Sequence, residues 1–176
     1  MFDFLRILIS FFDRNGIDYM LSGSVAMSTY TVPRFTRDFD FVVHLKEQDI
    51  PILVASFRDG YYCDEDAVTE AVRHKGMFNI IDHKSGYKAD FIILKNQPFR
   101  QAEFKRKRKI QFLDMSIQIV SPEDLLISKI IWIQDMQSAV QAEDIKSIYA
   151  LDGLDRAYIE DWINKLELNT FELLNE

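Results

Sequence analysis

A change of pattern near residue 120 constrains the fold of this chain more than any other feature. Before it, apolar runs rich in β-branched and aromatic residues, such as FDFVVHL at residues 39–45, alternate with helical segments and are typical of buried strands. From Ser121 onward the sequence has only helical patterns, with Ser121 as an N-cap and Pro122 in the first turn. The pattern predicts an α/β (α+β) fold, in which helices flank a short mixed sheet. The core would span residues 1–120, and a C-terminal helical segment at 121–176 would pack with it as one structural unit.

The individual elements are expected from the same periodicities. The opening segment has apolar residues at positions 4, 5, 8, 11 and 12, and reads as an amphipathic helix that ends at Asn15-Gly16. The secondary structure of segment 61–75 is ambiguous. The hairpin strands are expected at 78–81 and 87–94, the other strands at 17–21, 39–45 and 115–120, and the other helices at 25–30, 48–58, 98–109, 123–135, 139–151 and 156–165.

The composition is that of a globular protein with a substantial core. The chain has 176 residues, of which 48% are hydrophobic and 28% are charged, and this length suits one domain. The net charge of −7 argues against a surface that coats nucleic acid as a whole, but leaves room for a local basic patch. No stretch reaches the length of a transmembrane helix, and the apolar opening lacks the basic start of a signal peptide. Together with the single cysteine, Cys63, these features predict a cytoplasmic protein with no membrane partner.

Two aspartates, Asp38 and Asp40, stand at the start of the most apolar predicted strand. Alternate residues of a strand point to the same side, so the two carboxylates aim together while Phe39 and Phe41 face the core. Neighbouring carboxylates repel each other unless a cation lies between them. Mg²⁺ or Mn²⁺ accepts such an oxygen-only environment, especially when substrate phosphates complete its coordination.

Gly23-Ser24 and Asp90 extend this pattern. Gly23-Ser24 opens a short helix, where the backbone N–H groups and the Ser24 hydroxyl would cradle a phosphate and Gly23 would allow a close approach. Asp90 lies within a later apolar run, ADFII at residues 89–93. An acid in a strand that is otherwise made to be buried indicates a specific role. A site that binds two metals needs a third acid from a neighbouring strand.

Each of these features taken alone has a simpler explanation. A D-x-D pair is usually a solvated strand end or a cap, and a single acid in a strand is usually a paired core residue. Their order along the chain and their strand context favour the joint interpretation, which is in-line displacement at a phosphoryl group. One metal would activate the attacking hydroxyl, and the other would neutralise the triphosphate and the leaving pyrophosphate.

These motifs together resemble the signature of the DNA polymerase β-like nucleotidyltransferase superfamily. The segment RFTRDFD at 34–40 is similar to the R-x-T-x-D-h-D form found in small bacterial nucleotidyltransferase-like proteins. Those proteins are related to abortive-infection and minimal nucleotidyltransferase toxins of toxin–antitoxin systems. The later segments that resemble the same proteins are VSPEDLLISK at 120–129, QAEDI at 141–145 and a helix with the form h-D-x-x-Y-h-x-x-W at 154–162.

The resemblance implies a role for each matching residue in the core. Asp38, Asp40 and Asp90 would be the catalytic residues and would bind Mg²⁺ or Mn²⁺. Asp90 would also help to activate the acceptor hydroxyl. Gly23 and Ser24 would hold the triphosphate of an NTP such as ATP.

Further residues are implied to act around the phosphates. Arg34 and Arg37 would neutralise phosphate charge, and Lys129 would reach a phosphate or the base. Thr36 and Asp144 would support these groups without touching the nucleotide, and Asp144 would orient Lys129.

The expected function is therefore the transfer of NMP from an NTP to an acceptor hydroxyl, with release of pyrophosphate. RNA, tRNA or a protein is the favoured acceptor, as for the toxin of a toxin–antitoxin system, with an antitoxin as a partner. The alternatives are a catalytically silent module that binds a nucleotide or a protein, and a nucleotidyltransferase that modifies an antibiotic or another small molecule. A phosphohydrolase would need a water-activating group that the sequence does not supply.

The basic run and the two tryptophans can be explained without a role in catalysis. The basic run FKRKRK at 104–109 has two interpretations of about equal weight. It is either a surface that binds RNA through its phosphates, or a solvated helix end whose cations interact favourably with the negative end of the helix dipole. Trp132 and Trp162 fall on apolar helix faces and are expected in the core.

Overall fold

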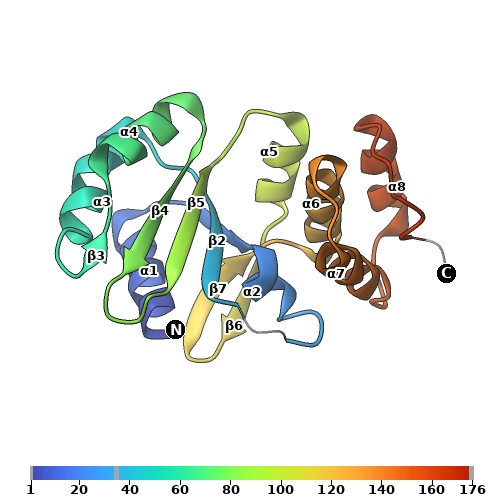
Figure 1. Cartoon of the computed structure of the whole chain (residues 1–176), viewed down its shortest axis with the longest axis horizontal. Helices are drawn as coiled ribbons and strands as arrows, with labels where there is room; N and C mark the ends of the chain where they lie inside the picture. Colours follow the sequence, from blue (N-terminus) through green and yellow to red (C-terminus); the bar gives the residue numbers. More distant parts are fainter. Residues whose placement is uncertain (1, 34–35, 175–176) are drawn as a thin grey trace.

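The computed structural model describes residues 2–33 and 36–174 as helices around one sheet (Figure 1). The helices are α1 (Phe2–Asn15), α2 (Gly23–Met27), the 3-10 helix η1 (Glu47–Asp49), α3 (Ile50–Ser56), α4 (Glu65–His74), α5 (Pro98–Lys105), α6 (Pro122–Asp135), α7 (Ala139–Tyr149) and α8 (Arg156–Lys165). The strands are β1 (Tyr19–Ser22), β2 (Asp38–Val43), β3 (Tyr61–Tyr62), β4 (Met77–Asp82), β5 (Lys88–Ile93), β6 (Arg108–Phe112) and β7 (Met115–Ile119).

Within the described residues, the strands form a single seven-stranded sheet in the order β3-β4-β5-β2-β1-β7-β6. The pairs β2–β5 and β1–β7 are parallel and the others are antiparallel, so the sheet is mixed, as the sequence predicts. The predicted hairpin is present as β4 and β5. The central strands β2 and β5 are the ones that carry the three aspartates.

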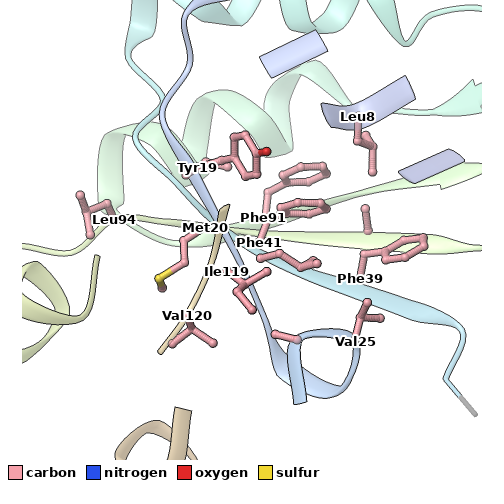
Figure 2. Packing of buried hydrophobic residues seen from close by; sticks show 14 of the residues in the cluster. Leu8, Tyr19, Met20, Val25, Phe39, Phe41, Phe91, Leu94, Ile119 and Val120 are labelled. Carbon is pink, nitrogen blue, oxygen red and sulfur yellow. The ribbon is translucent and has the colours of Figure 1, made fainter. Parts of the chain in front are cut away.

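One face of the sheet packs on α1 and forms an aromatic core. Along β2 and β5 every second side chain is buried, and Phe41 stacks on Phe91 with 5.6 Å between ring centroids. Phe12 of α1 packs edge-on against both rings; Phe41 and Phe91 lie together with Leu8 and Tyr19 in Figure 2. This burial fixes the register of both strands, because a slip of one residue would turn every carboxylate inward.

The opposite face of the sheet carries the aspartates and is bordered by α2, α5 and α6. Figure 1 shows α5–α8 gathered on one side of the molecule and α1, α3 and α4 on the other. Helix α6 begins as predicted, since the Ser121 side chain accepts a hydrogen bond from the backbone N–H of Asp124. Over the described part of the chain, no helix combines the length and the apolarity needed to cross a membrane.

The sequence prediction was wrong at the basic run. Helix α5 ends at Lys105, and Arg108–Phe112 forms the edge strand β6 instead of continuing a helix to residue 109. Strand β6 pairs with β7 through a two-residue turn in which Leu113 has a φ of 55°. The turn residues Leu113-Asp114 lack the glycine that marks a two-residue hairpin, so the hairpin was not predicted.

The exposed side chain of Trp132 also contradicts the prediction. Trp132 on α6 is 59% exposed, whereas Trp162 on α8 is partly buried and packs edge-on against Phe99. The ambiguous segment 61–75 contains the short strand β3 and helix α4, whose N-cap is Asp64.

Candidate active site

The three aspartates lie on one face of two adjacent parallel strands. Asp40 of β2 is directly opposite Asp90 of β5 in the strand register, and Asp38 lies two residues before Asp40 on the same side. The intervening Phe39 and Phe41 are buried in the aromatic core. The sequence therefore brings together two carboxylates separated by fifty positions, because both strands need their aromatic side chains on the other face.

Gly23 is packed against Asp40. Its φ is +62°, and a Cβ atom built on it would lie 2.6 Å from Asp40 Cγ. No side chain fits there, and the backbone conformation is one that only glycine adopts readily. The Gly23 backbone therefore lies close to the Asp40 carboxylate at the start of α2, while the close approach of a phosphate to Gly23 remains a prediction.

The pKa of Asp40 is affected by two neighbouring acids. Burial raises the pKa of Asp40, and the nearby charges of Asp90 and Asp38 raise it further. The charges of Lys129 and Lys88 act in the opposite direction on the same pKa. A buried carboxylate with two like-charged neighbours favours the binding of a cation.

Lys88 supplies an internal cation at this site, which the sequence prediction missed. Its Nζ lies 2.8 Å from Asp90 Oδ2 and 3.9 Å from Asp38 Oδ1. The hydrogen bond to Asp90 is the main reason why the pKa of Lys88 is raised. Lys88 lies two residues before Asp90 on β5, so strand alternation places it on the same face and would have identified it.

The carboxylate donors fit a divalent cation in their chemistry. Asp90 Oδ1 is buried and has no hydrogen-bond partner in the described part of the structure, and Asp40 is crowded by like charge. Oxygen donors of this kind suit Mg²⁺ or Mn²⁺. As they stand, however, no three His, Cys, Asp or Glu side chains among residues 2–33 and 36–174 are grouped closely enough to hold a metal ion.

Lys129 and Asp144 form an ion pair between α6 and α7. Lys129 Nζ donates to Asp144 Oδ2 at 2.8 Å, and the Asp144 side chain is buried. Lys129 also influences the pKa of Asp40, so its charge lies within reach of the aspartates. The structure thus brings together the two C-terminal residues that the sequence analysis paired.

Thr36 and Arg37 lie just before the start of β2, and Ser24 lies in α2. Thr36 Oγ1 accepts a hydrogen bond from the backbone N–H of Asp38 at 3.3 Å, which fixes the entry to the strand. The backbone oxygen of Arg37 accepts from Lys88 N–H at 3.2 Å, and the backbone oxygen of Ser24 accepts from Ser28 N–H within α2. Arg34 lies outside the described residues.

The basic run is engaged in ion pairs within the molecule. Arg106 lies 3.1 Å from Asp124 and 3.6 Å from Glu123, and Arg108 lies 3.3 Å from Glu123. Lys107 lies 3.0 Å from Asp18. The contacts of Arg106 and Arg108 anchor the start of α6 to the end of α5 and the start of β6, and Lys107 contacts the residue just before β1.

Tyr158 of α8 completes the polar network at the start of α6. Its hydroxyl donates to Asp124 Oδ1 at 2.6 Å, and Ser121 Oγ donates to Asp124 Oδ2 at 2.6 Å. Asp124 is fully buried, so these bonds satisfy a carboxylate that water cannot reach. Residues 121–124 therefore hold the start of α6 to the end of α5, to β6 and to α8.

Comparison with solved structures identifies the fold as that of the nucleotidyltransferases. The antibiotic-resistance factor ANT(2″)-Ia superposes with a TM-score of 0.64 at 10% identity, over 93% of this chain and 89% of that one. The lincosamide antibiotic adenylyltransferase LnuA, solved with lincomycin, gives 0.56 at 16% identity, over 83% and 94% of the two chains. An antigenic nucleotidyltransferase-like protein from Paracoccidioides brasiliensis gives 0.55 at 18% identity, over 90% and 85%. The sequence matches no family model and no curated protein.

Proposed function

We propose that this chain is a metal-dependent nucleotidyltransferase that transfers NMP from an NTP to an acceptor hydroxyl. The observation that carries the proposal is the placement of Asp40 opposite Asp90, with Asp38 on the same face and Gly23 packed against Asp40. The fold shared with nucleotidyltransferases of known structure supports it. From the composition and the single cysteine we expect the reaction to take place in the cytoplasm.

In this proposal Asp38, Asp40 and Asp90 would hold Mg²⁺ or Mn²⁺. The bound cation would neutralise phosphate charge and lower the pKa of the attacking hydroxyl. Asp90 Oδ1 has no other partner in the described structure and would accept the proton of that hydroxyl. The acceptor oxygen forms a bond to the α-phosphorus, and the bond from that phosphorus to the bridging oxygen breaks as pyrophosphate leaves.

The remaining residues would hold the triphosphate. Gly23 and Ser24 would face it at the start of α2, while Arg37 and Lys129, with Arg34, would balance its charge. The ion pair with Asp144 supports this role for Lys129, because a held ammonium loses less conformational entropy when it meets a phosphate. Thr36 would position Asp38 through its backbone.

A catalytically silent binding module is the second candidate. The contacts of Lys88 with Asp90 and Asp38 favour it, because an internal cation balances two of the carboxylates without metal. In the enzyme, Lys88 would move towards the phosphates once the cation binds.

The resemblance to toxins of toxin–antitoxin systems supports a macromolecular acceptor, RNA, tRNA or a protein, and a neighbouring antitoxin. The ion pairs of Arg106, Lys107 and Arg108 weaken the case for RNA, because these charges already have partners. The neighbours ANT(2″)-Ia and LnuA are connected with antibiotics, which supports a small-molecule acceptor as the alternative.

Label transfer tests the reaction itself. Purified protein is incubated with Mg²⁺ or Mn²⁺ and each α-labelled NTP, beside the variant Asp40→Asn and the surface control Asp161→Asn. Transfer of label with release of pyrophosphate, lost only in Asp40→Asn, would establish the enzyme. Nucleotide binding without any transfer to lysate protein, RNA or small molecules would favour the binding module.

A further inference from the structure

A cavity of about 350 Å³ lies beside the aspartates on the same face of the sheet. Val42 and Ile92 line it, and each is two residues beyond an aspartate on its strand, Asp40 or Asp90. Two residues of a strand span about 7 Å. The cavity is therefore the direct continuation of the carboxylate site along β2 and β5.

Apolar surface is exposed on two sides of this cavity. Met77 of β4 is paired with Ile92 in the strand register and is 60% exposed, and Trp132 of α6 is 59% exposed. Both side chains line the cavity. Large apolar side chains that stay uncovered next to a reactive centre are typical of ligand sites.

A polar group on α5 and α6 completes the lining. Glu103 is buried and accepts hydrogen bonds from Ser128 Oγ at 2.6 Å and from Arg100 Nη1 at 2.9 Å. Arg100 uses the same nitrogen for a 2.6 Å contact with Ser128. Over the described residues the other nitrogens of Arg100 form no hydrogen bond, so the guanidinium can offer N–H donors to a ligand.

We infer that this cavity binds the acceptor, and that the acceptor is a small molecule with a hydroxyl group and an apolar or aromatic ring. The inference rests on the proposed function. The ring would lie between Met77 and Trp132, a polar substituent would meet Arg100, and the hydroxyl would point towards Asp90.

The chemistry of the lining favours this occupant over nucleic acid. Arg100 is paired with Glu103, and the other charged residues of the lining are Lys95 and Asp135, so acids balance bases. A nucleic-acid strand needs an excess of cations along its path. A volume of about 350 Å³ falls at the lower end of the range for small-molecule pockets.

Occupancy of the cavity can be tested without turnover. Protein labelled with ¹³C in the methionine methyl groups is titrated with benzyl alcohol, a ring that carries a hydroxyl. We expect a saturable shift of the Met77 methyl signal, caused by the ring current, and no shift of Met136, which is 73% exposed but does not line the cavity. Shifts of both signals, or of neither, would overturn the inference.

The chemical class of the acceptor is tested by fractionating the lysate that supplies acceptors in the label-transfer assay. A lysate is separated into a low-molecular-weight filtrate, RNA and protein, and each is offered to wild type, Trp132→Ala and the control Met136→Ala. We expect label on a compound of the filtrate, and at least about a tenfold loss of transfer in Trp132→Ala alone, because aromatic anchors dominate binding. Binding of a non-hydrolysable NTP should be unchanged.

The outcomes separate this inference from the proposed function. Label on RNA or protein would refute the small-molecule acceptor and leave the enzyme in place. Weaker NTP binding by Trp132→Ala would make the cavity a nucleoside site and also refute the inference. No transfer to any fraction, with benzyl alcohol still bound beside Met77, would count against the proposed function and so against a role for the cavity in acceptor binding.

Discussion

Replacing Lys88 with methionine removes the internal cation of the site and keeps an unbranched side chain that is one heavy atom shorter. Lys88 is 35% exposed and its partner Asp90 is 14% exposed, so the pair lies between a surface and a buried ion pair. Exposed pairs contribute about 0.2–1 kcal/mol, and hydrogen bonds to charged groups contribute about 1.5–3 kcal/mol. In a chelator, Lys88→Met should therefore lower the free energy of unfolding by about 1–2 kcal/mol.

The same variant should bind divalent cations more tightly. Without the Lys88 ammonium, Asp38, Asp40 and Asp90 are balanced by fewer positive charges, and an added Mg²⁺ no longer competes with a cation 2.8 Å from Asp90. One unit charge at about 4 Å contributes about 1 kcal/mol in water and more in a partly buried site. The midpoint for stabilisation by Mg²⁺ or Mn²⁺ should fall by about tenfold or more.

Urea denaturation measures both effects, in EDTA and across a series of Mg²⁺ concentrations. The matched control is Lys146→Met, which removes an exposed pair with Glu143 at 3.9 Å and should change stability by less than about 0.5 kcal/mol. If Lys88→Met is no less stable than this control in EDTA, and its Mg²⁺ midpoint equals that of the wild type, Lys88 does not balance the aspartates and the reasoning fails.

Three further predictions concern packing and reactivity. Gly23→Ala should lose activity and at least about 1–2 kcal/mol more stability than Gly86→Ala, measured by thermal denaturation, because both positions have positive φ but only Gly23 would collide with Asp40. Tyr158→Phe should lower the free energy of unfolding by about 1–3 kcal/mol in urea, since it removes the bond to buried Asp124; equal stability would show that Asp124 needs only its other partners. Burial raises the pKa of Cys63 to about 11, so iodoacetamide at pH 8 should alkylate it on the order of 100-fold more slowly than a free cysteine, and the rate should keep rising with pH up to that pKa.

Much of the fold could be predicted because its signals are local. The alternation in β2 and β5, the hairpin between β4 and β5, and the N-cap at Ser121 are each written within a few neighbouring residues. The three aspartates could be selected as site candidates for the same reason, since strand alternation decides which side chains share a face. Their role in binding metal remains a prediction.

The features that were missed depend on contacts between distant segments. The run at 104–109 looks helical by itself, but α5 ends at Lys105 and β6 begins at Arg108. Arg106 and Arg108 reach Asp124 and Glu123 across this break. Trp132 lies on a mostly apolar helix, and only the packing of α6 shows which side borders the cavity. Neither the ion pairs of the basic run nor the packing of α6 can be deduced from the local periodicity of the sequence.

The contact between Gly23 and Asp40 also constrains how such a site can change during evolution. A lineage that acquires a side chain at position 23 while it keeps Asp40 passes through a protein with a displaced carboxylate and a strained backbone. A lineage that first shortens Asp40 removes two of the three atoms that a new Cβ would meet. Loss of the acid should therefore precede loss of the glycine, and a descendant that has a side chain at position 23 should already lack the carboxylate.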